Sequence, residues 1–145
     1  MSKTNIFILL ILLTLFLSCN RDDDNADQVP RIPTDIQINL NLPQYNPLLN
    51  PGGWVYALGG SQGIIIYRIS QSDFGVFDRH CTYQVVNSCR VNVNAEDNIT
   101  AADTECCGSV FNIVDGLPSE GPALRPLQTF EYQFNSNTNV LRVYN

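Results

Sequence analysis

The chain has 145 residues, of which 44% are hydrophobic, and its formal net charge is −6 at neutral pH. Eight basic residues stand against fourteen acidic ones, and the only lysine is Lys3. An acidic chain without a basic stripe argues against binding to nucleic acids or to acidic lipids through charge, because both need clustered Lys and Arg.

The first residues have the pattern of an export signal. Lys3 is followed by an apolar run from Ile6 to Leu17 and then by the small residue Ser18. A positive residue, about a dozen apolar residues and a small residue before the cleavage point are typical of a secretory signal peptide. The run is shorter than the roughly 20 residues that a transmembrane helix needs. We therefore expect residues 1–18 to be a signal peptide.

The next residue, Cys19, directly follows Ser18, and this arrangement resembles the lipobox of bacterial lipoproteins. Phe16 stands where that motif most often has Leu. The resemblance implies that Cys19 is acylated, becomes the new N-terminus and anchors the chain in a membrane. The alternative is an ordinary signal peptide followed by a chance cysteine.

Residues 19–33 have the composition of a tether. They include three consecutive Asp, two Pro and few apolar residues, so they bury too little surface to order themselves. An acidic run behind a lipidated cysteine also resembles the export signals of surface lipoproteins in Bacteroidetes. That resemblance implies a location at the outer membrane or cell surface, and a solvated spacer is the alternative.

Residues 34–145 are predicted to form one small all-β domain. The run from Asp35 to Pro43 alternates strictly between apolar and polar residues, which indicates a half-buried strand that ends at the proline. Later apolar or alternating runs are separated by turn sequences rich in Gly, Asn, Ser and Pro. These runs read WVYAL, GIIIYRI, FGVF, RVNV, VFNIV, TFEYQF and VLRVY. Seven or eight strands in about 110 residues indicate an antiparallel sandwich or a small barrel.

Several polar and aromatic residues of this domain have simple structural explanations. Turn carboxylates usually cap backbone amides, and we expect this of three aspartates. Trp54 and Tyr56 are expected to pack in the core or on a sheet face, and His80 is expected in a surface loop without a functional role. The three aspartates are Asp78, Asp103 and Asp115.

Four cysteines remain in the domain. In an oxidising compartment they are most simply explained as two disulfides, and four cysteines allow three pairings. A zinc or iron–sulfur site is the rival explanation. Zinc sites usually take cysteines from a C-x2-C spacing, and the adjacent Cys106 and Cys107 converge poorly on one metal. The other two cysteines are Cys81 and Cys89.

Two stretches, Phe77–Gln84 and Thr104–Tyr132, resemble the two cluster-binding loops of the Rieske [2Fe–2S] family. In that family the first loop reads Cys-x-His and the second reads Cys-x-x-His-Gly-Ser, followed by an aromatic residue, an Asp-Gly turn and Gly-Pro-Ala before Pro-Leu. This chain keeps CT, GSVF, DG and GPALRPL with compatible spacing, and the resemblance covers about Gly53 to the C-terminus. It implies a small antiparallel Rieske-like sandwich or barrel with two cysteine-bearing loops.

The cluster ligands of the family are mostly replaced. Cys81 matches the first-loop cysteine, but Tyr83 stands at the first His, Thr104 at the second-loop cysteine and Cys107 at the second His. A Rieske centre needs two thiolates and two imidazoles, and the chain contains a single histidine, His80. We therefore expect no cofactor. The alternative is a [2Fe–2S] cluster or another metal held by a non-standard set that includes Cys81 and Cys107.

The resemblance also implies a disulfide pairing. In one branch of the Rieske family, a further cysteine in each loop forms a disulfide that clamps the loops together. Cys106 matches one of these cysteines and Cys89 the other. Cys81 and Cys107 are then left at positions that face one another across the cluster, where they would form a second disulfide. The neighbours Cys106 and Cys107 would point in opposite directions, each to its own partner.

The sequence as a whole predicts a lipid-anchored, extracytoplasmic binding or structural protein. It contains no nucleophile elbow, no glycine-rich phosphate loop and no pair of residues suited to acid–base catalysis, so we do not expect an enzyme. The expected partners are the membrane, through the lipid, and a protein or small molecule of unknown identity. An electron-transfer or metal-binding protein is the main alternative, and a thiol–disulfide exchange partner is a third.

Overall fold

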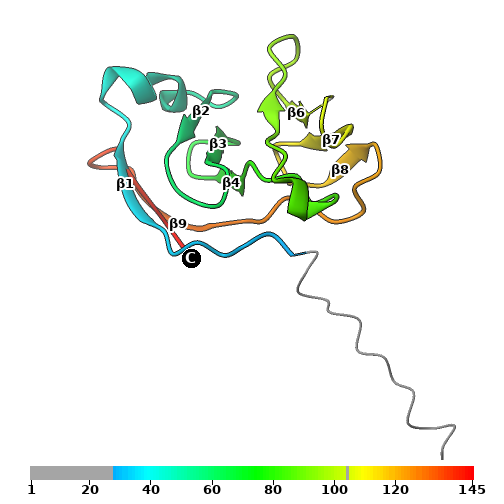
Figure 1. Cartoon of the computed structure of the whole chain (residues 1–145). Coiled ribbons are helices and arrows are strands. Elements are labelled where there is room, and N and C mark those ends of the chain that lie inside the picture. Colours follow the sequence, from blue (N-terminus) through cyan, green and yellow to red (C-terminus); the bar gives the residue numbers. More distant parts are fainter. Residues whose placement is uncertain (1–27, 104) are drawn as a thin grey trace, which may run out of the picture.

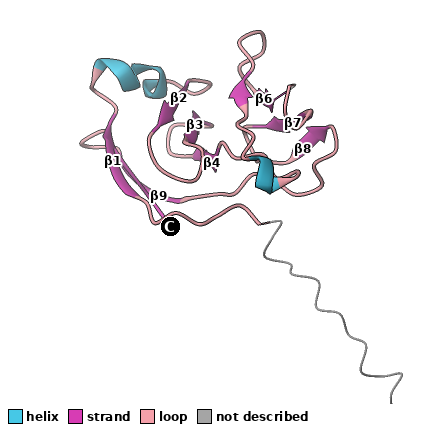
Figure 2. Cartoon of the chain, in the orientation of Figure 1, coloured by secondary structure: helices cyan, strands magenta, loops and turns pink. Residues whose placement is uncertain are grey.

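The computed structural model describes residues 28–103 and 105–145. The predicted signal peptide, Cys19 and most of the tether lie outside the described residues, as does Thr104. In the described part, strands form three antiparallel sheets, and the two helices are short 3-10 helices (Figures 1 and 2). No helix there has the length and hydrophobicity to cross a membrane. The all-β prediction is confirmed.

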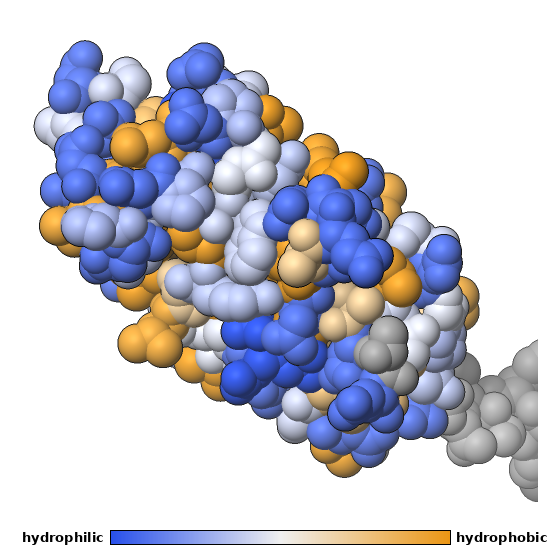
Figure 3. Space-filling view, turned by 90° about the horizontal axis from the view of Figure 1, so that it is seen from above, coloured by the Kyte–Doolittle hydropathy of each residue, from blue (hydrophilic) through white to orange (hydrophobic). Residues whose placement is uncertain are grey.

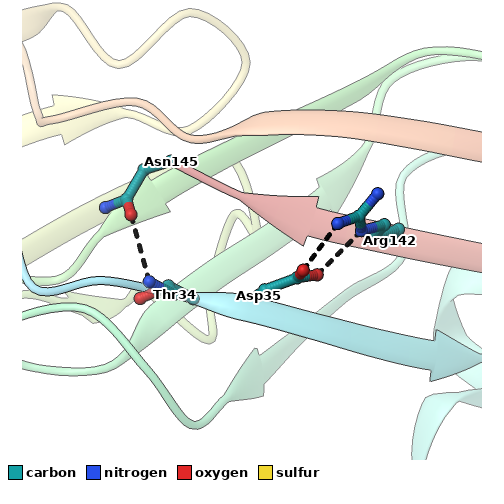
Figure 4. A network of polar contacts seen from close by, with 4 residues as sticks. All are labelled: Thr34, Asp35, Arg142 and Asn145. Atoms are coloured by element: carbon teal, nitrogen blue, oxygen red, sulfur yellow. Dashed lines mark hydrogen bonds and ion pairs between the residues drawn. The ribbon is translucent and has the colours of Figure 1, made fainter.

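The first sheet joins the two ends of the described chain. Its strands are ordered β1-β10-β9, with β1 at Asp35–Asn39, β10 at Val140–Tyr144 and β9 at Glu131–Asn135. Polar side-chain contacts between β1 and β10, and between the residues that flank these strands, reinforce the pairing (Figure 4). The Thr34 amide donates to Asn145 Oδ1 over 3.0 Å, and the Arg142 guanidinium donates to both carboxylate oxygens of Asp35.

The first strand is shorter than its alternating sequence predicts. It ends at Asn39, because the Leu42 amide donates to the Asn39 carbonyl over 3.1 Å and closes a turn. A 3-10 helix, η2, then runs over Pro43–Leu49. Leu42 therefore does not join the buried face that the alternation predicts, and 44% of it is exposed.

The second sheet lies in the middle of the molecule and has the order β2-β3-β4. Both faces of its central strand are buried: Ile64 and Ile66 contact one core cluster, and Ile65 contacts the other. A strand that is buried on both faces reads as a continuous apolar run, which explains the three consecutive isoleucines 64–66. The three strands are Trp54–Ala57, Ile64–Arg68 and Phe74–Asp78.

The third sheet is a meander of short strands. Its order is β5-β6-β7-β8, and a register shift between Val110 and Phe111 interrupts the pairing of the last two strands. Another 3-10 helix, η3 at Val85–Asn87, precedes the sheet. The four strands are Asn92–Val93, Thr100–Asp103, Ser109–Asn112 and Pro118–Glu120.

Two core clusters hold the three sheets together. One packs the first sheet on the second and includes Leu40, Val76 and Leu141. The other fills the space between the second and third sheets and includes Phe77 and Phe111. The sheets stay open, so the described part is a layered sandwich and the alternative of a small closed barrel is wrong. On the face seen in Figure 3, hydrophobic residues lie in separate small patches among hydrophilic ones.

Candidate functional site

The first cysteine loop begins where β4 ends and returns to β5 as a closed hairpin. Its two arms pair through backbone hydrogen bonds: the Cys81 amide donates to the Cys89 carbonyl over 2.9 Å, and the Val91 amide donates to the Arg79 carbonyl over 2.7 Å. Helix η3 forms the tip between these arms. The cysteines are thereby held on paired, hydrogen-bonded backbone rather than on a free loop.

Two disulfides connect this loop to the turn between β6 and β7. Cys81 is bonded to Cys107, with 6.6 Å between their Cα atoms, and Cys89 is bonded to Cys106, with 5.7 Å between theirs. These are the two pairs that the Rieske resemblance implies, and the adjacent cysteines have different partners. Bridges that close loops of 26 and 17 residues stabilise the fold by about 3 kcal/mol each in the chain-entropy model.

The two bridges differ in their surroundings. Cys81 and Cys107 are buried within the core cluster between the second and third sheets. Cys89 belongs to the same cluster, but its partner Cys106 is exposed to solvent. The Cys89–Cys106 bridge therefore closes the outer side of the junction, while the Cys81–Cys107 bridge is part of the core.

Two glycines of the second loop allow a close backbone contact. Gly121 has φ +96, and a Cβ there would overlap the Gly108 carbonyl. The Ser109 hydroxyl accepts a hydrogen bond from the Ala123 amide over 3.1 Å, in the buried space behind this contact. The hydroxyl of Thr82 donates to the Arg125 carbonyl over 2.6 Å, so the GPALRPL segment is also tied to the first loop.

The residues at the family's ligand positions do not fit a [2Fe–2S] cluster. The sulfur atoms of Cys81 and Cys107 are bonded to one another, so neither is available to iron. Tyr83 packs against the core cluster, and its hydroxyl accepts a hydrogen bond from Gln84 Nε2 over 3.2 Å. The fourth position, Thr104, lies outside the described residues. This donor set lacks the imidazoles and free thiolates that such a centre requires.

A further group of metal-binding residue types lies beside the outer bridge. In the part of the chain that the structure describes, ligand atoms of Cys89, Asp103 and Cys106 lie within 4.8 Å of one another. The two sulfurs form a disulfide, and the Asp103 carboxylate accepts a hydrogen bond from the Cys106 amide over 3.0 Å. The carboxylate caps the turn, as the sequence predicts. Because the two sulfurs are joined in a disulfide and carry no charge, the carboxylate is the one anionic metal ligand among the three residues.

His80 is buried, which contradicts the expected position in a surface loop. Only 2% of the residue is exposed. Its Nε2 donates to the Val85 carbonyl over 2.9 Å, since a carbonyl oxygen only accepts, and Nδ1 lies 2.8 Å from Ser61 Oγ. The imidazole thus connects η3 to the turn between β2 and β3. Sequence analysis missed this role because both partners are identified only by the fold.

Comparison with known proteins gives no family for the chain. No protein-family model matches it, and no curated protein matches it. We therefore base the functional proposal on the quoted Rieske-like residues and on the geometry of the two loops.

Proposed function

We propose that the chain is a lipid-anchored protein of the bacterial cell envelope, with a Rieske-like domain that has lost its [2Fe–2S] cluster and acts as a binding or structural module. The observation that carries the proposal is the Cys81–Cys107 disulfide. It joins the two positions that match a cluster ligand in each loop, and a bridge there holds the loops together in place of iron.

Three further features support the loss of the cluster. Tyr83 contributes a phenol where the family has an imidazole, and the only imidazole of the chain, on His80, is engaged by Ser61 and Val85. The second bridge ties the same two loops together from the outside. The loop scaffold is thus held by covalent bonds that need no metal, and a rigid pair of loops is suited to presenting a binding surface.

Metal analysis together with a count of free thiols tests this proposal. The chain is purified in detergent from a host that exports it to an oxidising compartment. We expect no stoichiometric iron or zinc and no free thiol among Cys81, Cys89, Cys106 and Cys107. Stoichiometric metal with reduced cysteines would overturn the proposal in favour of an electron-transfer or metal-binding protein.

A designed variant supplies the positive control for this experiment. Tyr83→His, Thr104→Cys and Cys107→His together restore the ligand types of the family, and they also remove the Cys81–Cys107 bridge. After reconstitution with iron and sulfide, we expect the triple variant to gain the visible absorbance of a [2Fe–2S] centre. The native chain should stay colourless under the same treatment. Equal uptake by both chains would contradict the argument from the ligand positions.

A further inference from the structure

A groove of about 310 Å³ lies where the second sheet meets the first cysteine loop. Tyr56 comes from β2, Arg79 directly follows β4, and Arg90 precedes β5. A hydrogen bond of 2.8 Å from the Val93 amide to the Tyr56 hydroxyl joins the two sides of the junction. Six residues with large side chains line the groove: Tyr45, Tyr56, Leu58, Gln62, Arg79 and Arg90.

The fold holds Arg79 in a fixed position beside the groove. Its Nε donates to the Val91 carbonyl over 3.0 Å, and Nη2 donates to Asn92 Oδ1. The guanidinium carbon lies 3.7 Å from the centre of the Tyr56 ring, within the range of a cation–π interaction. A guanidinium that is already ordered loses little freedom when it binds an anion, which favours binding.

No residue that the structure describes forms an ion pair with the positive charges of this groove. Among residues 28–103 and 105–145, neither Arg79 nor Arg90 has an ion-pair partner, and the one recorded contact of the Arg90 guanidinium is a hydrogen bond of 3.2 Å to Gln62 Oε1. The neighbouring carboxylate of Asp78 is occupied by three backbone amides. Two guanidinium groups without an ion-pair partner among the described residues therefore line one groove.

The electrostatics of Arg79 agree with this geometry. Burial lowers the pKa of its guanidinium from the usual range, and the positive charge of Arg90 lowers it further, while Tyr56 acts in the opposite direction. Both residues line the same groove, and their like charges repel one another. An anion between them would remove this repulsion and replace the water lost by the partly buried Arg79.

We propose that the groove binds a small molecule that carries a carboxylate or a phosphate, held between Arg79 and Arg90. Planar guanidinium groups form paired hydrogen bonds with either anion. Tyr45 and Leu58 provide an apolar wall for the rest of the ligand. The inference rests on the proposed binding role of the domain and gives that role a ligand class.

Trp54 provides a built-in reporter for such binding. It is the only tryptophan of the chain, and its ring centre lies 5.0 Å from that of Tyr56, the ring on which Arg79 stacks. Phenylacetate and phenyl phosphate are titrated into the full chain in detergent while the Trp54 fluorescence is followed. Phenylacetamide, which has the same shape as phenylacetate but no charge, is the neutral control.

We expect a saturable fluorescence change with at least one of the two anions, weaker at high salt, and none with phenylacetamide. A response to phenylacetate alone identifies a carboxylate site, and a response to phenyl phosphate alone identifies a phosphate site. Arg90→Gln should weaken binding about tenfold, equivalent to about 1.4 kcal/mol at 25 °C. Arg142→Gln, which removes the same charge from the first sheet, should leave the affinity unchanged.

Besides the absence of a response to both anions, two results would overturn the inference. One is an equal Trp54 fluorescence response to phenylacetamide and to both anions. This comparison uses the native chain alone, so it does not depend on the folding of a variant. The other is that Arg90→Gln and Arg142→Gln bind the anion with equal affinity while both variants melt at the same temperature as the native chain. A metal-free chain without free thiols that ignores both anions contradicts this inference alone. A metal-containing chain that binds them contradicts the proposed loss of the cluster alone.

Discussion

Asp78 ends strand β4 with its carboxylate fully buried, and it accepts hydrogen bonds from three backbone amides. The donors are Ser61 at 2.5 Å, Gln62 at 3.1 Å and His80 at 2.9 Å. Gly60 makes room for this carboxylate: it has φ +62, and a Cβ there would overlap Asp78 Oδ2. One side chain thus fixes both the turn after β2 and the start of the first cysteine loop.

Asp78→Asn is expected to lower the free energy of unfolding by about 2 kcal/mol. The asparagine amide keeps one accepting oxygen but places an NH2 group against a backbone N–H, so at least one buried donor loses its acceptor. Urea denaturation measures the change. The matched control is Asp115→Asn, because Asp115 is exposed and caps the single amide of Leu117. A loss for Asp78→Asn no larger than for Asp115→Asn would contradict the prediction.

At the level of single residues, the sequence predicts contacts between near neighbours in the chain better than contacts between residues that are far apart in the chain. Asp103 and Asp115 cap the amides of residues two or three positions later. Such contacts can be predicted from the sequence, because the two partners are close together in the chain. Asp78 does cap amides, but two of its donors lie 16 and 17 residues earlier in the chain. The expectation of a surface position for His80 fails for the same reason, because its partner Ser61 lies 19 residues away in the chain.

At the level of elements, the predicted strands are those that carry aromatic or branched apolar residues. The sequence does not predict strands β6, with the sequence TAAD, and β8, with the sequence PSE. Most of these residues have low strand propensity, and they form strands by pairing with their neighbours: β6 pairs with β5 and β7, and β8 pairs with β7. In the run TFEYQF, the aromatic residues alternate with polar ones and contact one core cluster. Phe130 is buried, and Tyr132 and Phe134 are partly buried in the same core cluster.

The pairing of the cysteines followed from the family resemblance, whereas the difference between the two bridges requires the fold. Spacing alone left three pairings open, and it gives no indication that Cys106 is exposed while Cys107 beside it is buried. The turn between β6 and β7 produces this difference by directing successive side chains to opposite sides of the junction.

The two bridges should be reduced in a fixed order. With dithiothreitol under native conditions, we expect the Cys89–Cys106 bond to break first, because the attacking thiolate reaches the exposed Cys106 without unfolding the core. Partial reduction, alkylation and peptide mass spectrometry identify the freed cysteines. In urea, where burial no longer protects either bond, the preference should largely disappear. Earlier release of Cys81 and Cys107 under native conditions would contradict the buried position of their bridge.

At the level of the whole molecule, three open sheets are joined by two core clusters, and both ends of the described chain meet in the first sheet. Strand β1 pairs with β10 along its full length, from Asp35 opposite Tyr144 to Asn39 opposite Val140. The sequence predicts both strands, but it does not predict that they are neighbours, since about 100 residues separate them. The alternation of apolar and polar residues along each strand shows which face is buried, but it does not determine which strand pairs with which.

The exposed pair between Asp35 and Arg142 makes this first sheet sensitive to acid. Hydrogen bonds from Arg142 and its positive charge lower the pKa of Asp35 below the usual value of 3.8. Hydrogen bonds from Thr100 and from backbone amides lower the pKa of Asp97 in the same direction. A carboxyl group with a lowered pKa in the folded state stabilises the fold above its unfolded pKa, and this contribution is lost as the pH falls through the folded pKa.

The urea midpoint of the native chain should therefore fall as the pH is lowered below about 4, because the unfolded state then binds more protons than the folded state. Arg142→Gln removes the partner of Asp35, so the decline should be shallower in this variant, while the share due to Asp97 persists. Arg90→Gln, which leaves both carboxyl groups untouched, should follow the native curve. Urea denaturation between pH 3 and 6 measures all three chains. Identical slopes for Arg142→Gln and the native chain would show that the bond to Asp35 is too weak in water to couple folding to protonation.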